Sequence, residues 1–188
     1  FHTERSGGFD PQRPLRVAYT TWKSRLGDRL AAATAGQGIY TFRRLGHEVA
    51  WPDLRELYRW ADVFVGTPLA EEGSYLPALE AMAAGALVVM PDAVGNRTYA
   101  RFGETCLEVA FDDPDSYLAA LEQIRQMPET EIEAMRSAAQ VTAAGHSLDE
   151  ERMALAGVLD QIEREALPRR RHPAAAAALA TQIREGWE

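Results

Sequence analysis

The stretch ADVFVGTPLAEEGSYLPALEAMAAGALVVM, residues 61–90, contains the pattern that decides the fold of this chain. Its segments 62–66 and 86–90 are compact apolar runs, which predict two short strands. Between them, Pro77 suits the first turn of a helix, and Gly85 suits its end. A strand, a loop, a helix and a second strand in this order predict one unit of a parallel sheet.

The same alternation continues on both sides of this stretch. Apolar runs predict further strands over residues 15–20, 39–45 and 106–111. Helical patterns cover residues 27–35, 53–60, 96–101, 115–126, 129–144 and 148–166. Short buried strands that alternate with helices are typical of an α/β, Rossmann-like domain, in which helices flank a mostly parallel sheet. Ligands of such sheets bind beyond the carboxyl ends of the strands, so the loops after Thr20, Gly66 and Met90 are candidate binding loops.

The chain length and local composition suggest three parts. With 188 residues, the chain is long enough for one domain with a sizeable core. We expect residues 1–13 to be a polar tail or linker, residues 14–167 to be the domain, and residues 168–188 to be a basic segment followed by a C-terminal helix. The chain begins at Phe1 rather than Met, which suggests a processed chain or a piece of a longer protein.

Composition excludes several classes of function. The net charge of −8 argues against a nucleic-acid partner, because binding to phosphate backbones needs a basic face. No apolar run is long enough for a membrane span. Cys106 is the single cysteine, so no internal disulfide can form, and we expect a reducing, cytoplasmic location. His47 and His146 have no metal-ligand companions at local spacing, and no metal site is expected.

The loop before the central helix has the features of an anion site. Glu72 and Gly73 precede the helix N-terminus, where free N–H groups and the helix dipole favour a negative ligand. Glu80 follows on the same helix, and seven residues separate it from Glu72. Two carboxylates on either side of an anion site suit a long ligand with hydroxyls at both ends and a diphosphate between them.

From Glu72 to Gly85 the chain reads EGSYLPALEAMAAG. This resembles the motif E-G-F-G-x-P-x-L-E-A-M-A-x-G of the retaining GT-B glycosyltransferases, the superfamily of sucrose- and glycogen-synthase-like enzymes. The resemblance covers about residues 52–125, including PDAVGN at 91–96 and FDDP at 111–114. It implies that the chain is the C-terminal, donor-binding half of a GT-B fold.

The resemblance also implies roles for individual residues. Glu72 would be the catalytic-site carboxylate that contacts the donor sugar, and Glu80 would bind the ribose diol. Backbone N–H groups of Gly73, Ser74, Tyr75 and Leu76 would bind the diphosphate. A basic pair after the first strand usually helps to neutralise it, and the local candidates are Lys23 and Arg25, although their spacing differs from the usual one. By the same resemblance, the donor would be a nucleoside diphosphate sugar, and the reaction would need no metal or other cofactor.

Three departures from the family pattern leave alternatives open. Tyr75 stands where a glycine is usual, so its side chain would narrow the phosphate site or form an aromatic wall. The stretch before Ala61 is one strand–helix unit short. The N-terminal acceptor domain is absent, so we expect it in cis or in trans and expect negligible transfer by this chain alone. The alternative function is a non-catalytic nucleotide- or sugar-binding module.

Each candidate site residue also has a purely structural interpretation. Glu72 and Glu80 are alternatively solvated carboxylates flanking a helix, and Lys23 and Arg25 are alternatively surface charge. The dipeptide at 95–96, Gly-Asn, predicts a helix N-cap at the asparagine, with a ligand-facing turn as the second interpretation.

Overall fold

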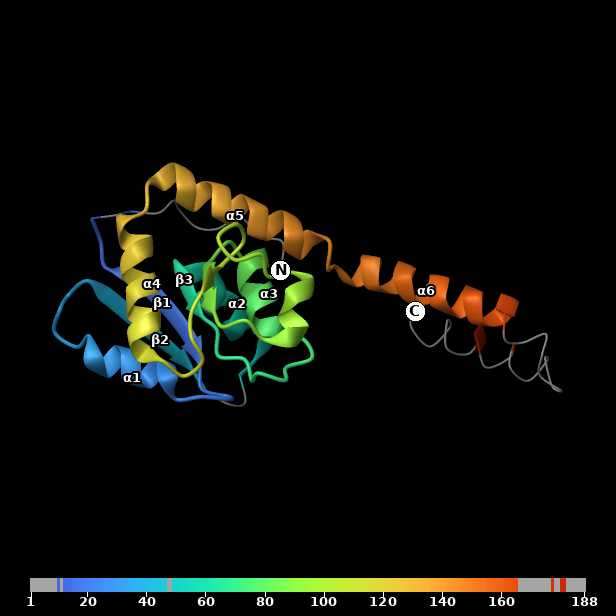
Figure 1. Cartoon of the computed structure of the whole chain (residues 1–188), viewed down its shortest axis with the longest axis horizontal. Coiled ribbons are helices and arrows are strands. Elements are labelled where there is room, and N and C mark those ends of the chain that lie inside the picture. Colours follow the sequence, from blue (N-terminus) through green and yellow to red (C-terminus); the bar gives the residue numbers. More distant parts are fainter. Residues whose placement is uncertain (1–9, 11, 47–48, 166–176, 178–179, 182–188) are drawn as a thin grey trace. The chain divides into compact units, whose positions relative to one another are not determined.

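The computed structural model describes residues 10, 12–46, 49–165, 177 and 180–181 (Figure 1). The chain divides into two compact units, Phe1–Ala144 and Gly145–Glu188. The boundary between them falls inside the predicted 14–167 domain. Most of the predicted 1–13 tail and of the predicted 168–188 segment lies outside the described residues.

The first unit contains a five-stranded sheet in the order β2-β1-β3-β4-β5. Its strands are β1 (Leu15–Thr20), β2 (Tyr40–Leu45), β3 (Val63–Val65), β4 (Leu87–Met90) and β5 (Leu107–Glu108). All four neighbouring pairs are parallel, which confirms the predicted α/β, Rossmann-like fold. The strand predicted over 106–111 is shorter than expected, because the amide of Ala110 donates to Ser116 Oγ (2.9 Å) rather than extending the sheet.

Helices cover both faces of this sheet. Strand side chains alternate between two cores: Val63 and Val65 belong to one, and Phe64 belongs to the other. The first core includes α1 (Leu26–Ala33) and α4 (Pro114–Gln126), and the second includes α2 (Trp51–Trp60) and α3 (Leu76–Ala83). Helix α5 (Glu129–Ala144) contributes side chains to both cores. Figure 1 shows α1 and α4 side by side. The second unit contains α6 (Leu148–Glu165).

The strand order reverses between β1 and β3. The chain passes from β1 outward to β2 and then returns to the other side of β1 to form β3. At such a switch point the loops after the two central strands leave in opposite directions and open a crevice. The loop after β1 carries Lys23, and the loop after β3 carries Glu72. The topology therefore brings two predicted site residues to the same edge.

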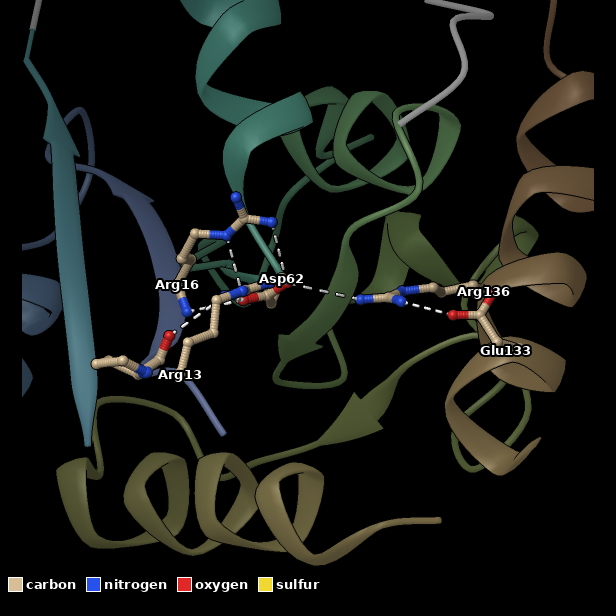
Figure 2. A network of polar contacts seen from close by, with 6 residues as sticks. Arg13, Arg16, Asp62, Glu133 and Arg136 are labelled. Atoms are coloured by element: carbon tan, nitrogen blue, oxygen red, sulfur yellow. Dashed lines mark hydrogen bonds and ion pairs between the residues drawn. The ribbon is translucent and has the colours of Figure 1, made fainter. Parts of the chain in front are cut away.

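A buried carboxylate ties the opposite, amino-terminal edge together. Asp62, directly before β3, is fully buried and accepts two hydrogen bonds from Arg13, at 2.5 and 2.8 Å. It also accepts from the backbone and the guanidinium of Arg16 in β1, at 2.9 and 3.4 Å. Arg136 Nη2 of α5 lies 3.9 Å from Asp62 Oδ1, and Glu133 pairs with the same arginine (Figure 2). One charge thus links β1, β3 and α5.

We expect Asp62→Asn to lower the free energy of unfolding by about 3 kcal/mol, because three arginines would lose their shared anion. Urea unfolding followed by circular dichroism measures the change. Asp92→Asn is the matched control, since Asp92 pairs with one exposed arginine, Arg97, and should show no measurable loss. Equal, small effects of both substitutions would contradict the structural importance of Asp62.

Candidate functional site

A cavity of about 290 Å³ opens at the carboxyl edge of the sheet. Its walls come from the loops after β1, β3, β4 and β5 and from the starts of α1 and α4. They comprise Lys23, Ser24, Leu26, Thr67, Pro68, Leu69, Ala70, Pro91, Phe111, Asp112 and Tyr117. The three candidate binding loops named from the sequence all contribute. The loop after β5 adds Phe111 and Asp112, which belong to the FDDP segment at 111–114 but were not predicted as site residues.

Three of the predicted site residues meet beside this cavity. Lys23 Nζ donates to Glu72 Oε2, and the two residues are 49 positions apart in the sequence. The amide of Leu69 also donates to Glu72 Oε2 (3.3 Å), which fixes the carboxylate against its own loop. The ammonium of Lys23 lies 5.6 Å from the centre of the Tyr75 ring, within the range of a cation–π contact. The pair is partly shielded, since 14% of the Glu72 side chain and 33% of the Lys23 side chain are exposed.

The loop between Glu72 and α3 presents backbone donors. Within the part of the chain that the structure describes, the amides of Gly73, Ser74 and Leu76 donate no hydrogen bond. The amide of Tyr75 donates to Asn96 Oδ1 (3.0 Å) and would have to leave it to reach a ligand. Pro77 has no N–H. Three amides at the start of α3 are therefore available to an anion.

Tyr75 lies beneath the loop rather than protruding into the site. The residue is 2% exposed, and its hydroxyl accepts from the amide of Thr67 (3.4 Å). Burial raises the pKa of the Tyr75 phenol. Tyr75 is not among the residues that line the cavity; its ring face lies below Lys23, and its side chain fills the space next to Gly66.

Glu80 lies apart from the Lys23–Glu72 pair. Its carboxylate faces α2, where the hydroxyl of Tyr58 donates to Glu80 Oε2 (3.2 Å). Burial raises the pKa of Glu80, and the hydrogen bond from Tyr58 opposes this shift. The structure thus makes Glu80 a half-buried acceptor on the α2 side of α3.

Arg25 does not join the pair either. Its guanidinium donates to Asp28 (2.8 Å) in the first turn of α1, and its side chain is largely exposed. The hydrogen bond from Arg25 is the largest factor that lowers the pKa of Asp28, followed by that from Tyr19. Of the two predicted cations, only Lys23 reaches Glu72.

The short 3₁₀ helix η1 (Val94–Thr98) contains residues whose importance the sequence did not reveal. The prediction of Asn96 as an N-cap is wrong: Ala93 occupies the cap position, and Asn96 is fully buried inside η1. Its Oδ1 accepts from the amide of Tyr75 and from the hydroxyl of Tyr99, each at 3.0 Å. The predicted helix over 96–101 is correspondingly shorter and begins two residues earlier. The Gly-Asn dipeptide after an apolar strand was the available signal, but the loop residue that Asn96 holds, Tyr75, lies 21 residues away in the sequence.

Two kinds of feature are absent from the described ranges of the chain. No group of three or more histidine, cysteine, aspartate or glutamate side chains there is arranged to hold a metal ion. None of the helices there combines the length and apolar character needed to cross a membrane.

Comparison with protein families gives one match to this architecture. Residues 23–127 match the family model of the group 1 glycosyl transferases. No curated protein shows significant sequence similarity to the chain.

Several solved structures share the fold. The pneumococcal O-GlcNAc transferase GtfA, solved with UDP and GlcNAc, is 19% identical over 86% of this chain and 38% of its own, with a TM-score of 0.64. The UDP-forming α,α-trehalose-phosphate synthase of Burkholderia vietnamiensis is 16% identical over 82% of this chain and 45% of its own, with a TM-score of 0.66. The C-terminal domain of the group 1 family protein LpcC from Francisella tularensis is 16% identical over 71% of this chain and 87% of its own, with a TM-score of 0.52. The chain thus spans less than half the length of the first two proteins.

The raised pKa of Glu80 predicts a pH-dependent stability. Because burial raises this pKa, the folded chain binds the proton more tightly than the unfolded chain, so the stability contributed at this position falls as pH rises through the raised value. Glu80→Gln does not titrate, and it should gain stability relative to the unaltered chain between about pH 4 and about pH 7. Urea unfolding at the two pH values measures the difference.

Glu122→Gln is the control with the opposite sign. Hydrogen bonds from Gln126 and Arg125 lower the pKa of Glu122, so its contribution to stability is lost as pH falls. The unaltered chain should therefore gain stability relative to Glu122→Gln as pH rises. The same pH trend in both variants would contradict the assignment.

Proposed function

The chain belongs to the group 1 glycosyl transferases, and on this premise we propose that its first unit binds a nucleoside diphosphate sugar as the glycosyl donor. The reaction is transfer of the glycosyl group to an acceptor, with the nucleoside diphosphate as leaving group. One observation carries this proposal. At the switch point of the sheet, Lys23 and Glu72 lie next to loop amides that donate no hydrogen bond within the described residues.

The chemistry of these groups matches the parts of such a donor. A diphosphate needs cations and N–H donors, and Lys23 with the amides of Gly73, Ser74 and Leu76 supplies both. Sugar hydroxyls need an acceptor, and the Glu72 carboxylate lies next to these amides. Donors directed at the phosphate oxygens would stabilise the charge that develops on the leaving diphosphate. We propose that transfer proceeds with retention of configuration and without a metal ion.

Donor binding would exchange partners at Lys23. In the structure Glu72 neutralises Lys23. A diphosphate carries more charge than a carboxylate and would take over the ammonium group, which frees Glu72 to accept from the sugar. Glu80, held by the Tyr58 hydroxyl, would accept from the ribose diol at the other end of the donor.

The acceptor would be bound by a second domain, on the same polypeptide or on a partner. The chain spans 38% of GtfA and 45% of the Burkholderia synthase, whereas it spans 87% of the C-terminal domain of LpcC. These proportions support the assignment of the chain as one half of a two-domain enzyme. The buried, free thiol of Cys106 accords with the proposed cytoplasmic location.

A non-catalytic binding module is the second candidate. The observation that favours it is Tyr75, whose amide is committed to Asn96 and whose side chain replaces the glycine of the family pattern. Such a module would bind a nucleotide or a sugar, but Glu72 and Glu80 would not have the separate roles that the transferase mechanism gives them.

Calorimetry on two glutamate variants tests the proposal. A panel of UDP-, GDP-, ADP- and dTDP-sugars identifies the donor, starting with UDP because GtfA was solved with it. Glu80→Gln should weaken binding of the nucleoside diphosphate about tenfold to a hundredfold, since a charged acceptor is lost. Glu72→Gln should weaken binding of the nucleotide sugar by about tenfold but leave binding of the bare diphosphate no weaker, because its carboxylate competes for Lys23.

Glu71→Gln is the matched control, because Glu71 is the exposed neighbour of Glu72 and should affect neither ligand. Equal losses for both ligands in both site variants would support the binding module instead. If no member of the panel binds the unaltered chain, the proposed function is wrong.

The isolated chain should transfer sugar far more slowly than a complete enzyme, because the acceptor side of the cleft is not part of it. We expect turnover with the identified donor to stay well below about 1 s⁻¹, the lower end of typical enzyme rates. Release of nucleoside diphosphate in the presence of candidate acceptors measures it. Turnover by this chain alone at typical enzyme rates would show that no second domain is needed.

A further inference from the structure

We infer that Gly95, Asn96 and Tyr99 are positioning residues, which hold the loop from Glu72 to Tyr75 in the geometry that binds the donor. The inference rests on the proposed function, because the loop amides and the Glu72 carboxylate are its proposed ligand groups. The three residues come from η1 and the residue after it, on the chain segment that follows β4. They therefore act on the loop after β3 from the neighbouring connection of the sheet.

Gly95 holds the front of the loop by close backbone approach. Its amide donates to the carbonyl of Glu72 (2.9 Å). A Cβ atom at position 95 would lie 1.7 Å from the carbonyl oxygen of Gly73 and 2.4 Å from that of Glu72. The backbone of Gly95 is not in the left-handed region, so close approach alone requires glycine here. Any side chain at this position would displace the carbonyl groups of Gly73 and Glu72.

Asn96 and Tyr99 hold the back of the loop through the backbone of Tyr75. Asn96 Oδ1 accepts from the Tyr75 amide (3.0 Å), and the Tyr99 hydroxyl donates to the Tyr75 carbonyl (2.8 Å). The same hydroxyl lies 3.0 Å from Asn96 Oδ1, so the two side chains support one another. Asn96 Nδ2 lies 3.6 Å from Met90 Sδ, which fixes the orientation of the side-chain amide.

The proposed ligand-binding amides lie between two residues whose backbones are held by η1. Glu72 and Tyr75 are tied to η1, whereas the amides of Gly73 and Ser74 between them have no partner among the described residues. Donors that are held in place before the ligand arrives bind more tightly than donors that must be ordered. Asn96 is fully buried and Tyr99 is 1% exposed, so neither residue can touch a ligand directly. Their effect must pass through the loop.

Amide hydrogen exchange tests the positioning without any ligand. Tyr99→Phe removes one oxygen atom and keeps the rest of the side chain. In Tyr99→Phe, exchange at the amides of Tyr75 and Gly95 should accelerate about tenfold relative to the amides of Gly66 and Leu87, which bond to the β3–β4 region. Acceleration at Gly95 is informative because that amide donates to the carbonyl of Glu72, at the other end of the loop from Tyr75.

Binding of UDP then tests whether the geometry matters for the site. Tyr99→Phe should weaken UDP binding about tenfold, and Gly95→Ala should weaken it further. Tyr40→Phe is the matched control, because it removes a phenol hydroxyl that contacts Glu122 on the far side of the domain, and it should leave UDP binding unchanged. Tyr99→Phe keeps the test decisive if Gly95→Ala does not fold.

The possible results distinguish failure of the positioning role from failure of the proposed function. Unchanged exchange at both amides in folded Tyr99→Phe would overturn the positioning role. Uniform acceleration throughout the sheet would also overturn it, since that pattern indicates general destabilisation. Faster loop exchange with unchanged UDP affinity would show that the held geometry is not used for binding, which also overturns the inference. If the unaltered chain binds none of the four nucleotide classes, the proposed function fails, while the exchange measurements still decide the positioning role.

Discussion

The carboxylate of Asp62 is the constraint on which the architecture depends. A charge that is fully removed from water must be paired, and here Arg13 and Arg16 at the start of β1 and Arg136 of α5 converge on it. These contacts fix the amino-terminal ends of β1 and β3, the two strands that flank the switch point. The loops at the opposite ends of the same strands therefore leave a rigid base. A binding edge made of loops needs this kind of support, because loops carry little packing of their own.

The local charge balance of the site differs from that of the whole molecule. The chain carries a net charge of −8, yet the proposed ligand is an anion. Lys23 reconciles the two, because it places one cation beside the loop that carries Glu72, and Glu72 pairs with it. Association would then swap one anionic partner for another. Any net gain in free energy on binding would then come from the additional amide donors.

How far the sequence predicts this molecule depends on the range of the interactions involved. Strands such as 15–20 and the helix after Pro77 follow from local periodicity and were predicted closely. The edge strand β5 was predicted too long, because side-chain bonding by Ser116 ends it. The approach of Lys23 to Glu72 required the strand order, and the role of Asn96 required contacts with Tyr75 and Tyr99 that no periodic pattern encodes. The local sequence around an asparagine is the same whether the residue is buried or caps a helix at the surface, so a single sequence does not separate the two roles.

The position of β2 at the end of the sheet has a consequence for solubility. This strand pairs with β1 on one side, and no other described strand pairs with it, so its outer N–H and C=O groups form an open template for strand addition. Arg43 and Arg44 are exposed on this strand, where Arg43 stacks over Trp60 at 4.2 Å and Arg44 lies 3.8 Å from Asp28. Two adjacent cations on a short strand oppose edge-to-edge aggregation. An edge strand of this composition resists fibril-like association.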